Sequence, residues 1–424
     1  MNEVRRFARV WLSAVLIFGA ASSTLVVAFS SPELSAPASA SPQTGVAWIR
    51  VAVVRDQPQV DLAIHGRFRI VALRTPAHPG ARVTVGAGSL QEGRWLPQVI
   101  VRATQEGILV GERVFPLFGV RVEPAREATI NLNGQRLRGT IEILRQPNLT
   151  LLVVNQVALE DYLRGVLSKE APHYWPKEAL RALAIAARTY TLFQRLSKTA
   201  VDYDVTGDIM SQVYGGRSAE KWQTTRAVRD TEGVILTYQG RVFPAFYHST
   251  CGGLTEHASV MGPYDVEPLH GGVTCSFCQE SPFYRWERRL SKADIAWALK
   301  QKGFGSVGTV TGLDVVQRTA TGRAAQVLIR GTSRTLTMKA YDFRALFGFE
   351  QLRSVAFTVE PEGDNVLLRG QGWGHGVGLC QWGTAELARR GLSAREILAV
   401  YYPHAEVVRL GEVAVQPVVV QGGS

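Results

Sequence analysis

The chain has 424 residues, of which 46% are hydrophobic and 20% charged, and its formal net charge is +11. These values exclude an intrinsically disordered chain and favour a globular protein with a sizeable core, for which two domains are a reasonable expectation. The positive charge favours an anionic partner such as an envelope polymer or a membrane surface. Nucleic acid is not expected as a partner, because the sequence has no zinc-finger, RRM or basic-helix pattern.

Residues 1–43 have the order of a targeting segment. Three arginines precede an uncharged apolar run from Val10 to Phe29, and a spacer rich in proline and small residues follows. This order is typical of a secretory signal peptide or of an uncleaved membrane anchor, since the run is long enough to span a bilayer. Both alternatives predict an extracytoplasmic protein of the periplasm or cell envelope, which meets the membrane only through this segment.

The next part of the chain alternates apolar and polar residues in short runs. Residues 44–124 are therefore predicted to form a β-rich N-terminal region, in which no catalytic pattern stands out. The same pattern continues to residue 155, with an Asn133-Gly134 pair that is typical of a tight hairpin. Helices are expected at 158–169 and from Trp175-Pro176 onward, and residues 411–424 are expected to form a C-terminal tail. The predicted fold class is α+β.

Two charged residues lie beside or within these helices. Glu170 comes between them, directly before Ala171 and Pro172, where a solvated loop carboxylate is the simplest interpretation. The second helix is apolar nearly all round from Ala179 to Phe193, except for Arg188. A buried guanidinium needs a partner. Arg188 is therefore expected either to have a structural role, in an ion pair or a clamp of backbone carbonyls, or to act as a cation in the active site.

The sequence contains only four cysteines, namely Cys251, Cys275, Cys278 and Cys380. Cys275 and Cys278 have the C-x-x-C spacing that lets two thiolates reach one tetrahedral ion, and His248 with Cys251 repeats this spacing as H-x-x-C. A structural zinc site is therefore expected, with Cys251, Cys275, Cys278 and either Cys380 or His248 as ligands. Two disulfides are the alternative, because an extracytoplasmic compartment permits them.

A glycine-rich segment, "GQGWGHGVGLCQWG", surrounds His375 with six glycines and two tryptophans. Glycines let the backbone approach a ligand or another strand closely, and the aromatic rings are suited to stacking on a sugar. A tight turn that packs around a core histidine is the structural alternative. No organic cofactor is expected, because the nucleotide-binding and hydrolase motifs G-x-G-x-x-G, Walker A, H-E-x-x-H and G-x-S-x-G are absent from the sequence.

Four segments in this order resemble the stage II sporulation protein D family, whose members include proteins named amidase enhancers. The segments, which cover about residues 125–408, are "VNQVALEDYLRGVLSKEAPHYWPKEALRALAIAARTY", "SQVYGG", "FYHSTCGGLTEHASVMG" and "GWGHGVGLCQWGTAELARRGLSAREILAVYYP". The resemblance implies a mixed helix/strand catalytic domain at 125–410, preceded by the β-rich region 44–124.

The resemblance also implies an activity: lytic transglycosylase cleavage of peptidoglycan glycan strands whose stem peptides have been removed. The family's catalytic acid, the glutamate of a "SEMP"-like motif, matches Glu170 in "SKEAP", where Ala171 replaces the methionine. Other polar positions that match the family motifs are Arg188, Tyr190, Gln212, His248, His375 and Gln381. The second functional hypothesis is a non-catalytic peptidoglycan-binding modifier that stimulates a partner cell-wall amidase.

The sequence departs from the family at one metal site. Some members have a His/Cys zinc cluster directly before the "QVY" motif, but Met210 and Ser211 stand at those positions here, so that site is not expected. In relatives with "HSTSGG" the histidine is present without the cysteine. This favours Cys380 over His248 as the fourth ligand, and a polar active-site role for His248.

Overall fold

The computed structural model describes residues 48–74, 84–198, 202–412 and 415–419. The predicted signal peptide or anchor, residues 1–43, lies outside this part of the chain. Within the described ranges, none of the helices combines the length and the apolar character needed to cross a membrane.

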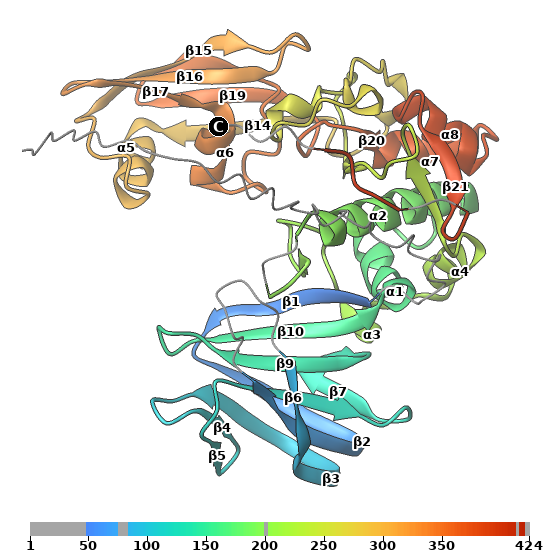
Figure 1. Ribbon diagram of the computed structural model, residues 1–424. Coiled ribbons are helices and arrows are strands. Elements are labelled where there is room, and N and C mark those ends of the chain that lie inside the picture. Colours follow the sequence, from blue (N-terminus) through green and yellow to red (C-terminus); the bar gives the residue numbers. More distant parts are fainter. Residues whose placement is uncertain (1–47, 75–83, 199–201, 413–414, 420–424) are drawn as a thin grey trace, which may run out of the picture. The chain divides into compact units, whose positions relative to one another are not determined.

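An 11-stranded sheet takes up the first part of the described chain (Figure 1). Its main path runs β11-β1-β10-β9-β6-β2-β3-β4-β5, and β7 pairs with β2 and β8. The strands are β1 (Trp48–Gln57), β2 (Gln59–Arg74), β3 (Thr84–Ala103), β4 (Ile108–Val110), β5 (Arg113–Phe115), β6 (Gly119–Pro124), β7 (Thr129–Leu132), β8 (Gln135–Leu137), β9 (Thr140–Arg145), β10 (Leu151–Ala158) and β11 (Val205–Thr206).

This sheet confirms the predicted β-rich region and explains its alternating pattern. In β1, Ile49 and Val51 are fully buried while Trp48 faces solvent, because successive side chains of a strand point to opposite faces. Asn133 and Gly134 both have positive φ, 49° and 79°, and they join β7 to β8 as the Asn-Gly pair predicted. The division predicted at residue 124 falls inside the sheet, because β1 pairs with β10 and β6 with β9.

Helices follow the sheet directly. Helix α1 (Leu159–Glu170) continues from β10 without a loop, and α2 (Lys177–Ser197) begins after Pro176. The remaining elements of this part are α3 (Gly216–Ala219), α4 (Trp222–Asp230), β12 (Val234–Thr237), β13 (Tyr247–His248), β20 (Leu379–Cys380), α7 (Gln381–Arg389), α8 (Ala394–Tyr401) and β21 (Glu406–Arg409). The fold is thus α+β, as predicted.

Residues 286–368 build a second hydrophobic core of their own. They form β14 (Arg285–Ser291), α5 (Lys292–Gln301), β15 (Val310–Arg318), β16 (Ala324–Gly331), β17 (Thr335–Lys339), α6 (Ala340–Phe347), β18 (Phe357–Glu362) and β19 (Asn365–Gln371). The chain enters and leaves this module through one strand pair, in which Arg285 lies opposite Gln371. The module therefore interrupts the chain between the cysteine loop and the glycine-rich segment.

Candidate active site

Glu170 is the last residue of α1 and not a loop residue. The helix ends there because Ala171 precedes proline and adopts an extended conformation, with φ −141° and ψ 142°. Trp175 then turns into the core, 5% exposed, and its ring packs edge-on against Trp382 at a centroid distance of 5.5 Å. The corner between the two helices is therefore rigidly packed, and it fixes the position of the Glu170 side chain.

Hydrogen-bond donors from two distant segments meet the Glu170 carboxylate. The backbone N–H of Val213 donates to Oε1 at 2.9 Å, and the side-chain amide of Gln381 donates to Oε2 at 3.2 Å. Burial raises the pKa of Glu170 above its ordinary value, and these two hydrogen bonds offset part of that rise. The half-buried carboxyl lines a cleft of about 280 Å³.

Two tyrosines form part of the cleft wall. Burial raises the pKa of Tyr190 to about 12 and that of Tyr247 well above its ordinary value, and the nearby Glu170 charge acts in the same direction. Both phenols therefore stay protonated at neutral pH and remain hydrogen-bond donors. Gln212 lies behind them, 1% exposed, and its Nε2 donates to the Tyr247 hydroxyl at 2.8 Å. Gln212 thus positions Tyr247, and it does not line the cleft.

His248 lines the same cleft with one ring nitrogen unpaired. Its Nδ1 lies 3.0 Å from the Val377 carbonyl oxygen, which can only accept, so Nδ1 carries the proton. Burial lowers the pKa of His248 well below its ordinary value, and the ring is therefore neutral. Its Nε2 is a buried acceptor without a hydrogen-bond partner among the described residues. This arrangement suits a hydroxyl or amide donor of a ligand.

His375 fastens the glycine-rich segment to the strand beside it. Its Nε2 donates to the Tyr247 carbonyl at 3.0 Å, and its Nδ1 accepts from the Val377 N–H at 3.0 Å. Both ring nitrogens are thus used by the backbone, although the ring also lines the cleft. Trp373 beside it lines the cleft too, and its ring packs edge-on with Phe283 at a centroid distance of 4.4 Å.

Arg188 is fully buried and tied to other groups. Its Nε and Nη2 donate to the two carboxyl oxygens of Glu160 at 2.8 and 2.7 Å, and Nη1 donates to the Val234 carbonyl at 3.0 Å. It does not line the cleft. Of the two alternatives left open by the sequence, this placement agrees with the structural ion pair and carbonyl clamp.

The structure thus sorts the predicted site residues into three groups. Glu170, Tyr190, His248 and His375 line one cleft, and Gln381 reaches Glu170 from α7. Gln212 lies outside the cleft and positions Tyr247, and Arg188 pairs with Glu160 away from the cleft. The Val213 N–H was not predictable, because a side-chain pattern gives no signal for a backbone donor, whereas the position of Tyr247 next to His248 was a usable signal. The cleft residues from the inserted module were not predicted either; they are Tyr341, Arg344, Phe349 and Glu350.

The four cysteines gather at a separate point of the same fold. Their sulfur atoms all lie within 4.8 Å of one another, each residue is buried, and all four thiols are free in the structure. His248 is not part of this group, since its ring faces the cleft and the Val377 carbonyl. The set Cys251, Cys275, Cys278 and Cys380 therefore contains the residues that are able to hold a metal ion here.

Gly374 allows His248 to sit where it does. A Cβ atom at this position would lie 2.7 Å from the Cβ of His248, and φ is +115°. We expect Gly374→Ala to lower the thermal midpoint more than Gly391→Ala, whose φ is +92° but whose Cβ would meet nothing within 4 Å. Both changes carry a backbone cost of about 1–2 kcal/mol, and only the first adds a steric clash. Equal midpoints for the two variants would contradict this role of Gly374.

The protein is expected to lose stability as the pH falls from about 6.5 towards 4. Burial lowers the pKa of His375 from 6.5 to about 4, so in this window the unfolded chain binds a proton that the folded chain does not. The loss attributable to His375 is about 3 kcal/mol, and it is complete below the folded pKa. Melting curves between pH 7 and 4 should show a shallower fall for His375→Gln than for wild type. The control variant His404→Gln, at a position 64% exposed, should follow wild type, and identical slopes for all three proteins would refute the assignment.

Comparison with known proteins supports the resemblance seen in the sequence. A family model described as stage II sporulation protein matches residues 148–238, and one described as a domain of unknown function matches residues 275–378. An uncharacterized protein of Brachyspira hyodysenteriae is 30% identical over 324 residues, which are 73% of this chain and 84% of that protein. The amidase enhancer of Bacillus subtilis is 27% identical over 331 residues, which are 67% of this chain and 46% of that protein.

A third relative establishes the family to which the chain belongs. The stage II sporulation protein D of Bacillus subtilis is 30% identical over 305 residues, which are 68% of this chain and 84% of that protein. The match spans most of both chains. The chain therefore belongs to the stage II sporulation protein D family.

Proposed function

We propose that the protein is a lytic transglycosylase that cleaves peptidoglycan glycan strands without stem peptides, with Glu170 as its single acid and base. The observation that carries this proposal is the Glu170 carboxyl itself. It is partly desolvated, lines a cleft of about 280 Å³, and is held in place by a donor on each oxygen. A raised pKa is what a carboxyl needs in order to be protonated, and to act as an acid, near neutral pH.

The reaction needs one carboxyl because the sugar supplies the nucleophile. Protonated Glu170 donates its proton to the glycosidic oxygen, and the bond between that oxygen and C1 of the muramyl residue breaks. The 6-hydroxyl oxygen of the same muramyl residue bonds to C1, and its proton passes to the Glu170 carboxylate. The products are a 1,6-anhydro-muramyl end and a free hydroxyl on the other strand fragment, and no water is consumed. An ordinary glycosidase would use two carboxylates.

The cleft walls suit a sugar chain. Trp373 contributes an aromatic ring, over which the guanidinium of Arg353 lies at 5.6 Å from the centroid. The Tyr190 and Tyr247 hydroxyls are donors, and Nε2 of His248 is an acceptor. Such a mixture of flat aromatic rings and fixed polar groups is common in ligand clefts. The net charge of +11 favours a polymer that carries carboxylates. A peptidoglycan substrate also agrees with the predicted export of the chain through residues 1–43 and with a location in the cell envelope.

A second function is favoured by one observation, the relative named amidase enhancer. In this alternative the protein binds peptidoglycan, has no chemistry of its own, and stimulates a partner amidase. Denuded glycan strands incubated with the purified protein separate the two hypotheses. Release of fragments with 1,6-anhydro ends, detected by mass spectrometry, is expected from the transglycosylase. Intact strands, together with faster release of stem peptides when an amidase is added to whole peptidoglycan, would support the alternative and overturn the first.

A further inference from the structure

Three separate stretches of the chain bring the four cysteines together, and we call this group the four-cysteine cluster. Cys251 follows β13, Cys275 directly precedes the short 3-10 turn η3 (Ser276–Cys278), Cys278 is the last residue of that turn, and Cys380 ends β20. None of the four is more than 1% exposed. Four thiols from three segments, all turned towards one point in the core, form a built site and not a chance surface cluster.

The spacing of the sulfur atoms fits a tetrahedral metal ion. A Zn–S distance of about 2.3 Å places the sulfurs of a tetrahedral site about 3.8 Å apart. Here Sγ of Cys251 and Sγ of Cys278 are 3.5 Å apart, and all four sulfurs lie within 4.8 Å of one another. Hard cations such as Mg²⁺ and Ca²⁺ prefer oxygen ligands, so the four sulfurs select a thiophilic ion.

Hydrogen-bond donors around the sulfurs point to thiolates and not to disulfides. The backbone N–H groups of Cys251 and Gly383 donate to Sγ of Cys380 at 3.3 and 3.4 Å, and that of Gly253 donates to Sγ of Cys251 at 3.3 Å. Tyr401 Oη lies 3.2 Å from Sγ of Cys275. A charged sulfur is a far better acceptor than a neutral disulfide sulfur, and metal ligands are commonly oriented by such bonds.

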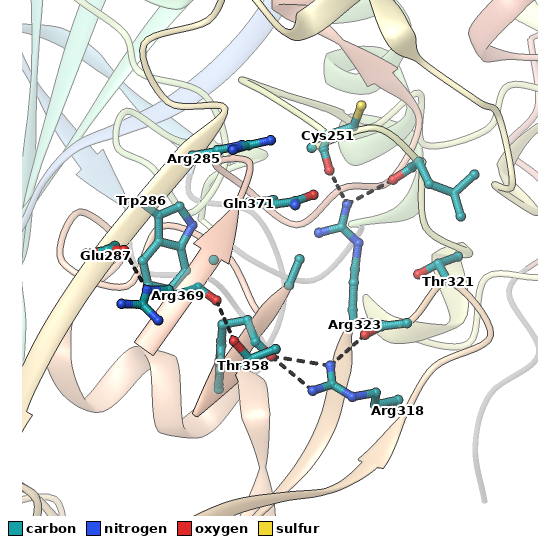
Figure 2. A pocket seen from close by; sticks show the side chains of 16 residues that line it. Cys251, Arg285, Trp286, Glu287, Arg318, Thr321, Arg323, Thr358, Arg369 and Gln371 are labelled. Atoms are coloured by element: carbon teal, nitrogen blue, oxygen red, sulfur yellow. Dashed lines mark hydrogen bonds and ion pairs between the residues drawn. The ribbon is translucent and has the colours of Figure 1, made fainter. Parts of the chain in front are cut away.

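A buried arginine of the inserted module supports the same loop. The Nη2 atom of Arg323, whose side chain is 4% exposed, donates to the carbonyl oxygens of Cys251 and Leu254 (Figure 2). Its positive charge lies next to a cluster that would carry a net charge of −2 with four thiolates and one divalent ion. Arg323 also pairs with the buried carboxylate of Glu256, 3.9 Å from its Nε, so it supports the loop chiefly through the two carbonyl bonds.

From these observations we propose that the four-cysteine cluster binds one Zn²⁺ as a closed structural site, which holds together the two segments that complete the Glu170 cleft. Cys380 is followed directly by Gln381, which reaches Glu170, and it lies opposite His248 in the parallel pair of β13 and β20. Cys251 follows His248 by three residues, just beyond the end of β13. The metal is therefore a clasp for both cleft residues and takes no part in bond making. The effect of the metal on the cleft rests on the proposed glycan cleavage, whereas metal binding by the four cysteines does not depend on that activity.

The first test measures the metal on the full chain, purified with a reductant and without chelators, then incubated with zinc and desalted. Elemental analysis should find one zinc per chain. Co²⁺ in place of zinc should give the thiolate charge-transfer and d–d bands of a tetrahedral sulfur site. Absence of zinc after reduction and zinc incubation, or a cobalt spectrum without sulfur ligands, would overturn the proposal. So would two disulfides in the natively isolated protein, seen by mass spectrometry under non-reducing conditions.

The second test compares a variant of the four-cysteine cluster with a variant of the other possible metal-binding group, His257, Asp265 and His270. Cys275→Ser with Cys278→Ser should abolish zinc binding and lower the thermal midpoint. A matched control is His257→Ala with His270→Ala, which alters the group formed by the half-buried His257 and the exposed Asp265 and His270 and should keep one zinc per chain. Zinc lost from the histidine variant and kept by the cysteine variant would contradict the assignment. If the cysteine variant does not fold, the cobalt spectrum of the wild type still decides the ligands.

The third test separates the clasp from the proposed activity. Removal of zinc by a strong chelator should lower both the melting midpoint and glycan cleavage, and zinc should restore both. Zinc bound by a protein that never cleaves glycan would refute the proposed function and leave the metal site standing. Full cleavage by zinc-free protein would refute the clasp and leave the proposed function standing.

Discussion

Replacement of Glu170 by glutamine is expected to abolish glycan cleavage while the fold stays intact. The amide keeps the size of the carboxyl and an acceptor for the Val213 N–H, which now binds Oε1 at 2.9 Å. It has no proton to transfer at the pH of the reaction, so the rate should fall by about 10²–10⁴-fold, the usual contribution of a general acid or base. The measurement is the yield of 1,6-anhydro ends from denuded strands, with the thermal midpoint as the check on folding.

Glu350 provides the matched control for this experiment. It is an exposed glutamate at the same cleft, contributed by the inserted module, and it is the carboxylate that a two-carboxylate mechanism would need. Glu350→Gln should keep most of the wild-type rate if the sugar supplies its own nucleophile. Loss of cleavage in Glu350→Gln would indicate a hydrolase with two carboxylates. Continued formation of anhydro ends by Glu170→Gln would end the case for Glu170 as the acid.

The largest effect on stability is expected at the ion pair between α1 and α2. Glu160→Ala leaves the guanidinium of Arg188 without its charge partner, and the Arg188 side chain is 0% exposed. An uncompensated buried charge typically costs about 3–5 kcal/mol, so the urea midpoint followed by tryptophan fluorescence should fall strongly. Glycan cleavage per folded molecule should be nearly unchanged, because Arg188 does not line the cleft.

The neighbouring aspartate is the control for the ion pair. Asp161 pairs with Arg164 at 2.7 Å, and both side chains remain about one-third exposed, 32% and 28%. Asp161→Ala should therefore cost less than about 1 kcal/mol. Equal midpoints for the two alanine variants would show that the buried pair contributes no more than a surface pair. A Glu160→Ala protein that folds but no longer cleaves glycan would instead restore Arg188 as an active-site cation.

Local sequence patterns predicted the parts of the fold that local physics controls. The alternation of apolar and polar residues predicted the sheet strands, and Asn133-Gly134 predicted a hairpin. Pro172 indicated the end of the first helix, and Pro176 indicated the start of the second. The partner of Arg188 was not predictable in this way. Glu160 lies 28 residues earlier, and only the packing of α1 on α2 decides which side chains meet.

The cleft shows the same limit. Glu170 and Gln381 are 211 residues apart. Both were predicted as site residues from the family resemblance, because their spacing in the sequence gives no sign that they meet. The donor from Val213 belongs to the backbone, which every residue except proline has, so its role depends on where the chain passes. Gln212 was expected among the functional residues, yet its side-chain N–H groups donate to the Tyr247 hydroxyl and to the Ala187 carbonyl. Polar type alone does not separate a residue that meets the ligand from one that supports it.

The inserted module has a consequence for how this protein diversifies. Its core is its own, and its two ends lie side by side where Arg285 pairs with Gln371. Glu170 ends α1, whose buried face belongs to the other core, while the module supplies Tyr341, Phe349 and Glu350 to the cleft. Substitution of these three residues therefore changes one wall of the cleft, whereas exchange of the whole module would also remove Arg323, which donates to the carbonyl oxygens of Cys251 and Leu254. Both hydrogen-bond donors to the Glu170 carboxylate, the Val213 N–H and the Gln381 amide, lie outside the module, so substitutions at its cleft positions leave that carboxylate and its partners unchanged.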